Sequence, residues 1–188
     1  MKLLIIDNYD SFTYNLIQLV EKSGVSDYKL VKNNHINTLS PNDFDHVLIS
    51  PGPGLAHQAG DLMQFIKQYY KEKSFLGVCL GFEAVIQNFN GTLSQLETPL
   101  HGFQNKAYTV SEDKIFRNFP SDFKIGHYHS WFVKEENLPP ELEVTVRDSQ
   151  NMIMGVKHEK YEVRGVLFHP ESYMTENGWL LISNWLSL

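Results

Sequence analysis

Gly77-Val78-Cys79-Leu80-Gly81 is the stretch that decides the fold, because it separates two different hydrophobic patterns. The apolar run at 74–78 predicts a strand, and an apolar face at helical spacing predicts a helix over 81–89. A cysteine between glycines at such a junction is typical of the elbow that presents a nucleophile. The turn is sharp, so side chains at the flanking positions would meet the neighbouring backbone.

Cys79 is the only cysteine in the chain, so no internal disulfide can form. The N–H groups and positive dipole end of the following helix should lower the pKa of its thiol. The alternative is a small buried core residue, which is the commoner role of a lone free cysteine. The two flanking glycines at a strand-to-helix junction favour the nucleophile.

Upstream of the elbow, strands and helices alternate. Strands are predicted at Lys2–Ile6 and Val47–Ile49, and helices over 12–20 and 61–70, each with an apolar face at helical spacing. This alternation predicts an α/β fold, with a mostly parallel central sheet and helices on both faces.

Downstream of the elbow the pattern changes to short strand-like runs, closed by a helix near 179–186. We expect a mixed or antiparallel extension of the sheet, and a single domain over residues 1–188. The predicted strands are Ala107–Val110, Leu142–Val146, Met152–Val156 and Val163–Phe168.

His169 and Glu171 follow the last predicted strand. Residues two apart in extended chain share a face, so Glu171 could orient the imidazole of His169 as the base of a nucleophile. Pro170 biases His169 toward an extended conformation. The alternative is a structural histidine, since spacing alone does not bring His169 to Cys79.

Ser50-Pro51-Gly52-Pro53-Gly54 follows another buried strand. Two prolines and two glycines make a rigid loop that could turn a backbone N–H inward. Together with the N–H of Leu80, it would form an oxyanion hole. The alternative is an ordinary tight turn. A phosphate-binding loop is disfavoured, because the segment has no Gly-Lys-Ser/Thr motif.

Composition narrows the class of protein. A formal charge of -6 at pH 7 argues against a general nucleic-acid binder. The apolar run after Lys2 is too short for a secretory or membrane-spanning segment, so a cytoplasmic protein is expected. Histidine and cysteine lack metal-ligand spacing, so no metal or other cofactor is expected.

Five separated motifs together resemble those of the class I (triad) glutamine amidotransferases. The resemblance runs from residue 3 to residue 187 and is strongest to the glutaminase subunits of anthranilate synthase and aminodeoxychorismate synthase. The motifs are Asp7 to Asn15, Ser50 to Gly54, Gly77 to Gly81, Tyr128-His129-Ser130 and Phe168 to Ser172.

The resemblance implies a flavodoxin-like fold and a catalytic triad of Cys79, His169 and Glu171. It implies L-glutamine as substrate, and a pocket formed by Gly52, Pro53, Gly54, Ser130 and Trp131. It also implies a partner subunit that binds chorismate and receives ammonia through a shielded passage. Tyr128 and His129, expected in a loop, are given a supporting role.

Departures from the family pattern lie close to the elbow. Phe82-Glu83 stands where His-Gln is usual, and an ionised Glu83 can accept but not donate a hydrogen bond. We therefore expect weaker glutamine binding, a raised pKa of Glu83 or a rearranged contact. Phe103, His127 and Leu167 also replace usual residues. The loss of two cationic positions leaves docking to the partner open, and the alternative is simple drift within a functioning lineage.

Several functions remain open at this stage. The leading hypothesis is the glutaminase subunit of aminodeoxychorismate synthase, in the folate branch, and its counterpart in anthranilate synthase, in the tryptophan branch, is the alternative. A docking or regulatory subunit with weakened glutamine use is a second class, favoured by Phe82 and Glu83. A free-standing γ-glutamyl hydrolase is a third.

Overall fold

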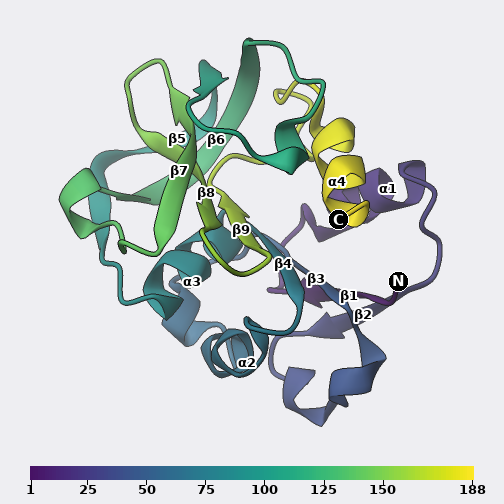
Figure 1. The fold of residues 1–188 in the computed structure, drawn as a ribbon. Helices are drawn as coiled ribbons and strands as arrows, with labels where there is room; N and C mark the ends of the chain where they lie inside the picture. Colours follow the sequence, from purple (N-terminus) through teal and green to yellow (C-terminus); the bar gives the residue numbers. More distant parts are fainter.

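The computed structural model describes residues 1–188, in which nine strands form one sheet. Their order across the sheet is β2-β1-β3-β4-β9-β8-β7-β5-β6 (Figure 1). The strands are β1 (Leu3–Asp7), β2 (Tyr28–Lys32), β3 (His46–Ile49), β4 (Ser74–Val78), β5 (Leu93–Thr109), β6 (Asp122–Val133), β7 (Leu142–Asp148), β8 (Ile153–His158) and β9 (Val163–Val166). The helices are α1 (Thr13–Lys22), α2 (Leu62–Tyr69), α3 (Leu80–Asn88) and α4 (Gly178–Leu186).

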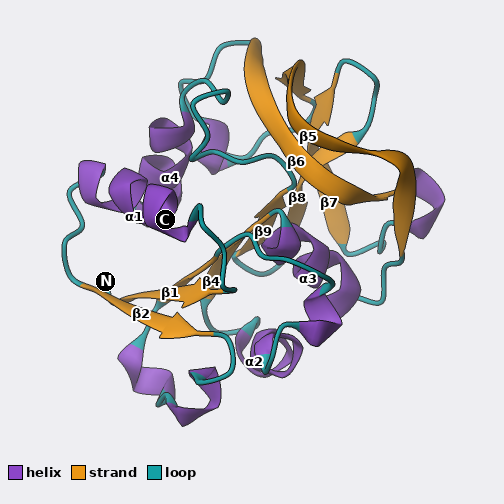
Figure 2. Cartoon of the chain, turned by 180° about the vertical axis from the view of Figure 1, so that it is seen from behind, coloured by secondary structure: helices purple, strands orange, loops and turns teal.

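Strands β2, β1, β3, β4 and β9 are parallel to one another. Helices α1 and α4 pack together on one face, and α2 and α3 pack together on the other (Figures 1 and 2). Strands β1 and β4 are buried along their whole length, as expected of strands covered on both faces. The predicted parallel half of the fold is confirmed.

The helices bury the faces that their spacing predicts. All four apolar residues predicted for α2 are buried, and in α3 Phe82, Val85 and Ile86 are buried. Helix α4 is attached to the sheet by a hydrogen bond that Trp185 Nε1 donates to Ser74 Oγ at 3.1 Å. Burial of such faces, rather than helix propensity, supplies most of the stability of helices this short.

Strand β9 joins the two halves of the sheet. It pairs with β4 in parallel, where Val78 lies opposite Val166, and with β8 in antiparallel fashion. The chain beyond Val166 therefore emerges beside the end of β4, where Cys79 follows. This topology brings the two distant motifs to one edge of the sheet.

The antiparallel half is larger than the sequence predicts. Strands β5 and β6 form a long curled ribbon (Figure 2), of which only 107–109 belongs to a predicted strand. Residues 128–130 lie within β6, so the prediction of a loop there is wrong. The edge strand β2 was not predicted, and β9 ends at Val166 rather than Phe168.

Candidate active site

Cys79 occupies a strained turn between β4 and α3, with φ 52° and ψ −103°. Positive φ is unfavourable for a residue with a side chain and persists only where the surrounding structure imposes it. A Cβ on Gly77 would lie 2.3 Å from the backbone of Gly81, and one on Gly81 would lie 2.9 Å from the carbonyl oxygen of Ile49. The predicted elbow, with glycine required on both sides, is confirmed.

The thiol of Cys79 is buried with only 6% of the residue exposed. Burial raises its pKa, and the neighbouring His169 opposes this rise only in part. The prediction of a lowered thiol pKa is therefore wrong for this structure. Removing a thiolate from water costs more than the favourable charges around it return.

His169 and Glu171 form the predicted pair, with 2.6 Å between Nδ1 and Oε1. They do not lie in extended chain, because the N–H of Ser172 bonds to the carbonyl of His169 in a tight turn. The turn, and not strand alternation, brings the carboxylate to the ring. Both side chains are almost fully buried.

The two nitrogens of His169 have different surroundings. Nδ1 binds Glu171, whereas Nε2 is buried and has no hydrogen-bond partner. Burial lowers the pKa of His169, but Cys79 and Glu171 outweigh it and raise the pKa to about 10. The imidazole and the thiol are thus close enough to shift each other's pKa, although the sulfur does not meet Nε2 in hydrogen-bonding geometry.

Four residues hold His169 in place: Gly126, Thr175 and Phe12, which were not predicted for the site, and Tyr128, which was given a supporting role. The N–H of His169 donates to the carbonyl of Gly126 at 3.2 Å, and the hydroxyl of Thr175 donates to the carbonyl of His169 at 2.6 Å. The ring of Tyr128 packs edge-on against it at 4.9 Å, and that of Phe12 at 5.5 Å. Only tertiary structure joins these residues, so no sequence spacing could reveal them.

The loop Ser50 to Gly54 follows β3, next to the elbow after β4. Asn8 anchors it, because its backbone N–H donates to Ser50 Oγ at 2.9 Å and its Nδ2 donates to the Ser50 carbonyl at 2.8 Å. A Cβ on Gly52 would lie 2.6 Å from Cβ of Asn8 and 3.5 Å from Cδ1 of Leu80. The structure therefore brings the predicted loop against the first residue of α3.

Glu83 lies in the first turn of α3 and is only 3% exposed. Its Oε2 is buried without a partner, and burial raises the pKa of the side chain to about 8. Of the three predicted consequences of this residue, the raised pKa is confirmed. At neutral pH the side chain is a carboxylic acid that can donate a hydrogen bond.

Ser130 and Trp131 lie on β6 and are half-buried. Side chains alternate along a strand, so Ser130 is on the same face as Tyr128, which packs against His169. The carbonyl of Trp131 bonds to His129 Nδ1 at 2.9 Å. Both predicted residues thus lie on the strand that borders the candidate base.

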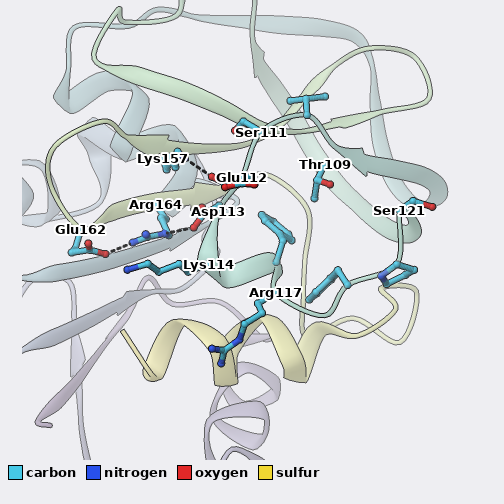
Figure 3. A pocket seen from close by; sticks show the side chains of 14 residues that line it. Thr109, Ser111, Glu112, Asp113, Lys114, Arg117, Ser121, Lys157, Glu162 and Arg164 are labelled. Atoms are coloured by element: carbon cyan, nitrogen blue, oxygen red, sulfur yellow. Dashed lines mark hydrogen bonds and ion pairs between the residues drawn. The ribbon is translucent and has the colours of Figure 1, made fainter.

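A cavity of about 860 Å³ lies elsewhere and contains none of the predicted site residues (Figure 3). It opens at the start of β9, away from the carboxyl ends of the parallel strands. Arg164 crosses it and pairs with Asp113 at 2.8 Å and Glu162 at 2.6 Å. The cavity contains neither Cys79 nor His169, so we take the elbow as the candidate active site instead.

No cluster of three or more His, Cys, Asp or Glu side chains is arranged to hold a metal ion. None of the helices has both the length and the apolar character needed to cross a bilayer.

Comparison with known proteins agrees with this geometry. The chain is 36% identical to aminodeoxychorismate synthase component 2 of Escherichia coli, over 98% of both chains. It is 37% identical to anthranilate synthase component 2 of Lactococcus lactis, over 98% of this chain and 93% of that one. A glutamine amidotransferase structure from Thermotoga maritima has the same fold, with a TM-score of 0.69 at 16% identity over 91% of this chain and 76% of that one.

A family description, "Glutamine amidotransferase class-I", matches residues 4–187, which include the elbow, the Pro-Gly loop and the His169–Glu171 turn. With nearly the whole chain matched, the protein belongs to the class I glutamine amidotransferases.

Proposed function

We propose that Cys79 attacks the side-chain amide carbon of L-glutamine, with His169 as acid and base and Glu171 as its orienter. The observation that carries the proposal is the buried Nε2 of His169, which is unpartnered beside the sulfur while Nδ1 binds Glu171. A base held at one nitrogen and free at the other is the arrangement that a nucleophile needs.

The reaction has two steps. The pair reacts in the form that holds one proton, with that proton on Nε2 of His169, whose pKa is raised to about 10. The thiolate of Cys79 forms the S–C bond, and the C–N bond breaks as the imidazolium gives its proton to the departing ammonia. Water, deprotonated by His169, then attacks the glutamyl thioester and releases glutamate and the free thiol. Because burial raises the pKa of the thiol and the pKa of His169 is raised as well, this singly protonated form of the pair becomes more abundant as pH rises.

The negative oxygen that develops on the substrate needs donors that are already in place. The N–H of Leu80 and an N–H of the Gly52-Pro53-Gly54 loop supply them, and the loop's attachment to Asn8 supports this role. We assign glutamine binding to Ser130, Trp131 and Glu83, the last as a neutral acid.

Ammonia produced in this way needs an acceptor. We propose a chorismate-binding synthase subunit as the partner, because relatives of similar identity carry the names of component 2 of anthranilate synthase and of aminodeoxychorismate synthase. Between the two we favour aminodeoxychorismate synthase, on the divergent residues Phe103, His127 and Leu167, with anthranilate synthase as the alternative. Purification of the native complex and identification of its product from chorismate tests the choice.

Cys79→Ser tests the chemistry. In the complex with its synthase subunit, this variant should lose glutamine-dependent synthesis and keep synthesis from free ammonium. Trapping the wild-type sulfur with a diazoketone analogue of glutamine, followed by peptide mass spectrometry, should locate the label on Cys79. If Cys79→Ser still uses glutamine, the proposed mechanism is wrong.

A second candidate function is a docking subunit with weakened glutamine use. The buried Glu83 favours it, since Glu83 ionises above about pH 8 and would then disfavour the α-carboxylate of glutamine. The labelling experiment separates the two functions, because a docking subunit would not be alkylated at Cys79 by the glutamine analogue.

A further inference from the structure

Strand β6 carries two buried histidines that lie outside the triad. His127 has no exposed surface and His129 is 4% exposed. Nδ1 of His127 lies 3.0 Å from Nε2 of His129, and Nδ1 of His129 lies 2.9 Å from the carbonyl oxygen of Trp131. The two rings thus form a hydrogen-bonded chain that ends on the backbone.

The carbonyl of Trp131, at the end of this hydrogen-bonded chain, determines which ring nitrogens carry protons. A carbonyl oxygen can only accept, so Nδ1 of His129 carries a proton and its Nε2 accepts from Nδ1 of His127. Both rings are then neutral, in agreement with burial, which lowers the pKa of each to about 4. Nδ1–H is the less usual tautomer of free histidine, so the structure imposes it on both.

The chain does not depend on Asp148, the one carboxylate near it. Asp148 Oδ2 is 3.9 Å from Nε2 of His127, too far for a hydrogen bond. Other donors satisfy this carboxylate: the N–H groups of Gln150 and Met152 at 3.0 and 2.8 Å, and Asn105 Nδ2 at 3.3 Å. The two histidines are therefore hydrogen-bonded to the backbone of Trp131 and not to Asp148.

The β5–β6 ladder is interrupted at this position. Gln95 lies opposite Trp131 and Leu100 opposite His129, so four residues of β5 bulge out opposite Ser130. Regular strand pairing does not fix the backbone there. The bond from His129 to the Trp131 carbonyl compensates for the interruption.

We propose that His129, held by His127, is a positioning residue that sets the backbone at Ser130 and Trp131 for glutamine binding. This inference rests on the proposed function, in which those two residues hold the substrate. It assigns no contact with the reacting atoms, which lie at Cys79 and His169.

Alkylation of Cys79 by the diazoketone analogue tests the proposal, because its concentration dependence separates binding (KI) from reaction (kinact). His129→Phe keeps a buried ring and removes both hydrogen bonds. It should raise KI about tenfold, the effect of losing one buried hydrogen bond, and leave kinact within about twofold. His129→Asn, whose amide N–H can replace the Nδ1 donor, should recover most of the affinity.

His46→Phe is the matched control, because both ring nitrogens of His46 are buried without partners and it begins β3, at the far end from the elbow. It should leave KI and kinact unchanged. An unaltered KI in His129→Phe, a loss confined to kinact, or no recovery in His129→Asn would each overturn the proposal.

The wild-type protein provides a test that needs no variant. In ¹⁵N spectra of histidine-labelled protein, two rings should be neutral Nδ1–H tautomers down to about pH 5. Finding His127 or His129 as the Nε2–H tautomer would also overturn the inference. Failure of the proposed function looks different, since the wild-type sulfur itself would then resist alkylation.

Discussion

A Cβ on Gly77 would lie 2.3 Å from both the carbonyl carbon and the oxygen of Gly81, and backbone atoms cannot rotate away as a side chain can. Gly77→Ala should therefore displace the elbow, at a cost of about 3 kcal/mol or more. We expect a lower melting temperature and loss of Cys79 alkylation, measured by calorimetry and mass spectrometry.

Gly24→Ala is the control for this substitution. Gly24 has φ 88° with no atom within 4 Å of an added Cβ, so only backbone strain of about 1 kcal/mol is added. Alkylation should be unchanged. Normal alkylation in Gly77→Ala would show that the elbow tolerates a side chain.

Glu83 makes stability depend on pH. Its pKa in the folded protein, about 8, is above the ordinary 4.5. Its contribution to the free energy of unfolding is therefore complete below pH 4.5 and is lost as pH rises toward 8. Each pH unit in that window costs up to about 1.4 kcal/mol. Glu83→Gln should remove this slope, which urea unfolding at pH 5 and pH 8 measures.

The exposed Glu97→Gln on β5 provides the comparison for Glu83→Gln and should keep the wild-type slope. The same Glu83→Gln protein also tests substrate binding in the complex. An unchanged KM for glutamine would mean that the neutral acid already serves as well as an amide.

The Pro-Gly loop is held in part by the side chain of Asn8, which follows the end of β1. Asn8 donates to the Ser50 carbonyl and accepts from Asn33 Nδ2 at 3.0 Å. Asn8→Ala removes the bond to the Ser50 carbonyl and keeps the backbone bond to Ser50 Oγ, so it should loosen the loop and the proposed oxyanion donor. We expect the rate of glutamate formation to fall about 10- to 100-fold.

Asn8→Asp separates the two contacts, because a carboxylate keeps the acceptor for Asn33 and loses the donor to Ser50. We expect its rate of glutamate formation to fall nearly as far as that of Asn8→Ala. Wild-type activity in either variant would show that the loop is positioned without Asn8.

The elements that the sequence predicts are those buried on one face or on both. Strand β4 and helix α2 show this, since their apolar spacing is regular and every predicted side chain is buried. Strand β2 escaped prediction because it is an edge strand whose residues are all exposed or half-buried. Most of β5 is exposed as well, so its ribbon with β6 lacks a hydrophobic pattern.

The candidate site also has features that the local sequence predicts and features that only the whole fold determines. The flanking glycines and the His-x-Glu pair are local signals, and they point to the proposed nucleophile and base. The net pKa of Cys79 depends on how deeply the whole fold buries it, which a helix-dipole argument cannot supply. The frame around His169 comes from residues 12, 126, 128 and 175, which only the folded sheet brings together.

For the whole molecule, buried titratable groups predict a stability maximum near pH 6.5. The pKa values of His127 and His129 are lowered to about 4, so their contributions are lost as pH falls from 6.5 toward 4. The pKa of His169 is raised to about 10, so its contribution is lost as pH rises from 6.5 toward 10. Glu83 adds to the decline on the alkaline side.

Thermal melts from pH 4 to pH 10 would measure this curve. We expect the melting temperature to fall on both sides of the maximum. The free energy of unfolding should change by on the order of 1 kcal/mol per pH unit. A melting temperature that rises steadily from pH 6.5 to pH 9 would contradict the ionisation states assigned to the site. His127→Phe should flatten the acid side only.

Under the proposed mechanism, the position of β9 also determines when this protein becomes reactive. It is the last strand to leave the ribosome, yet it lies inside the sheet, between β4 and β8. Pairing over so long a stretch of chain is slow, so β4 waits with an open edge while the rest is made. A nascent chain therefore carries its sulfur without a base beside it, and acquires reactivity only when the sheet closes.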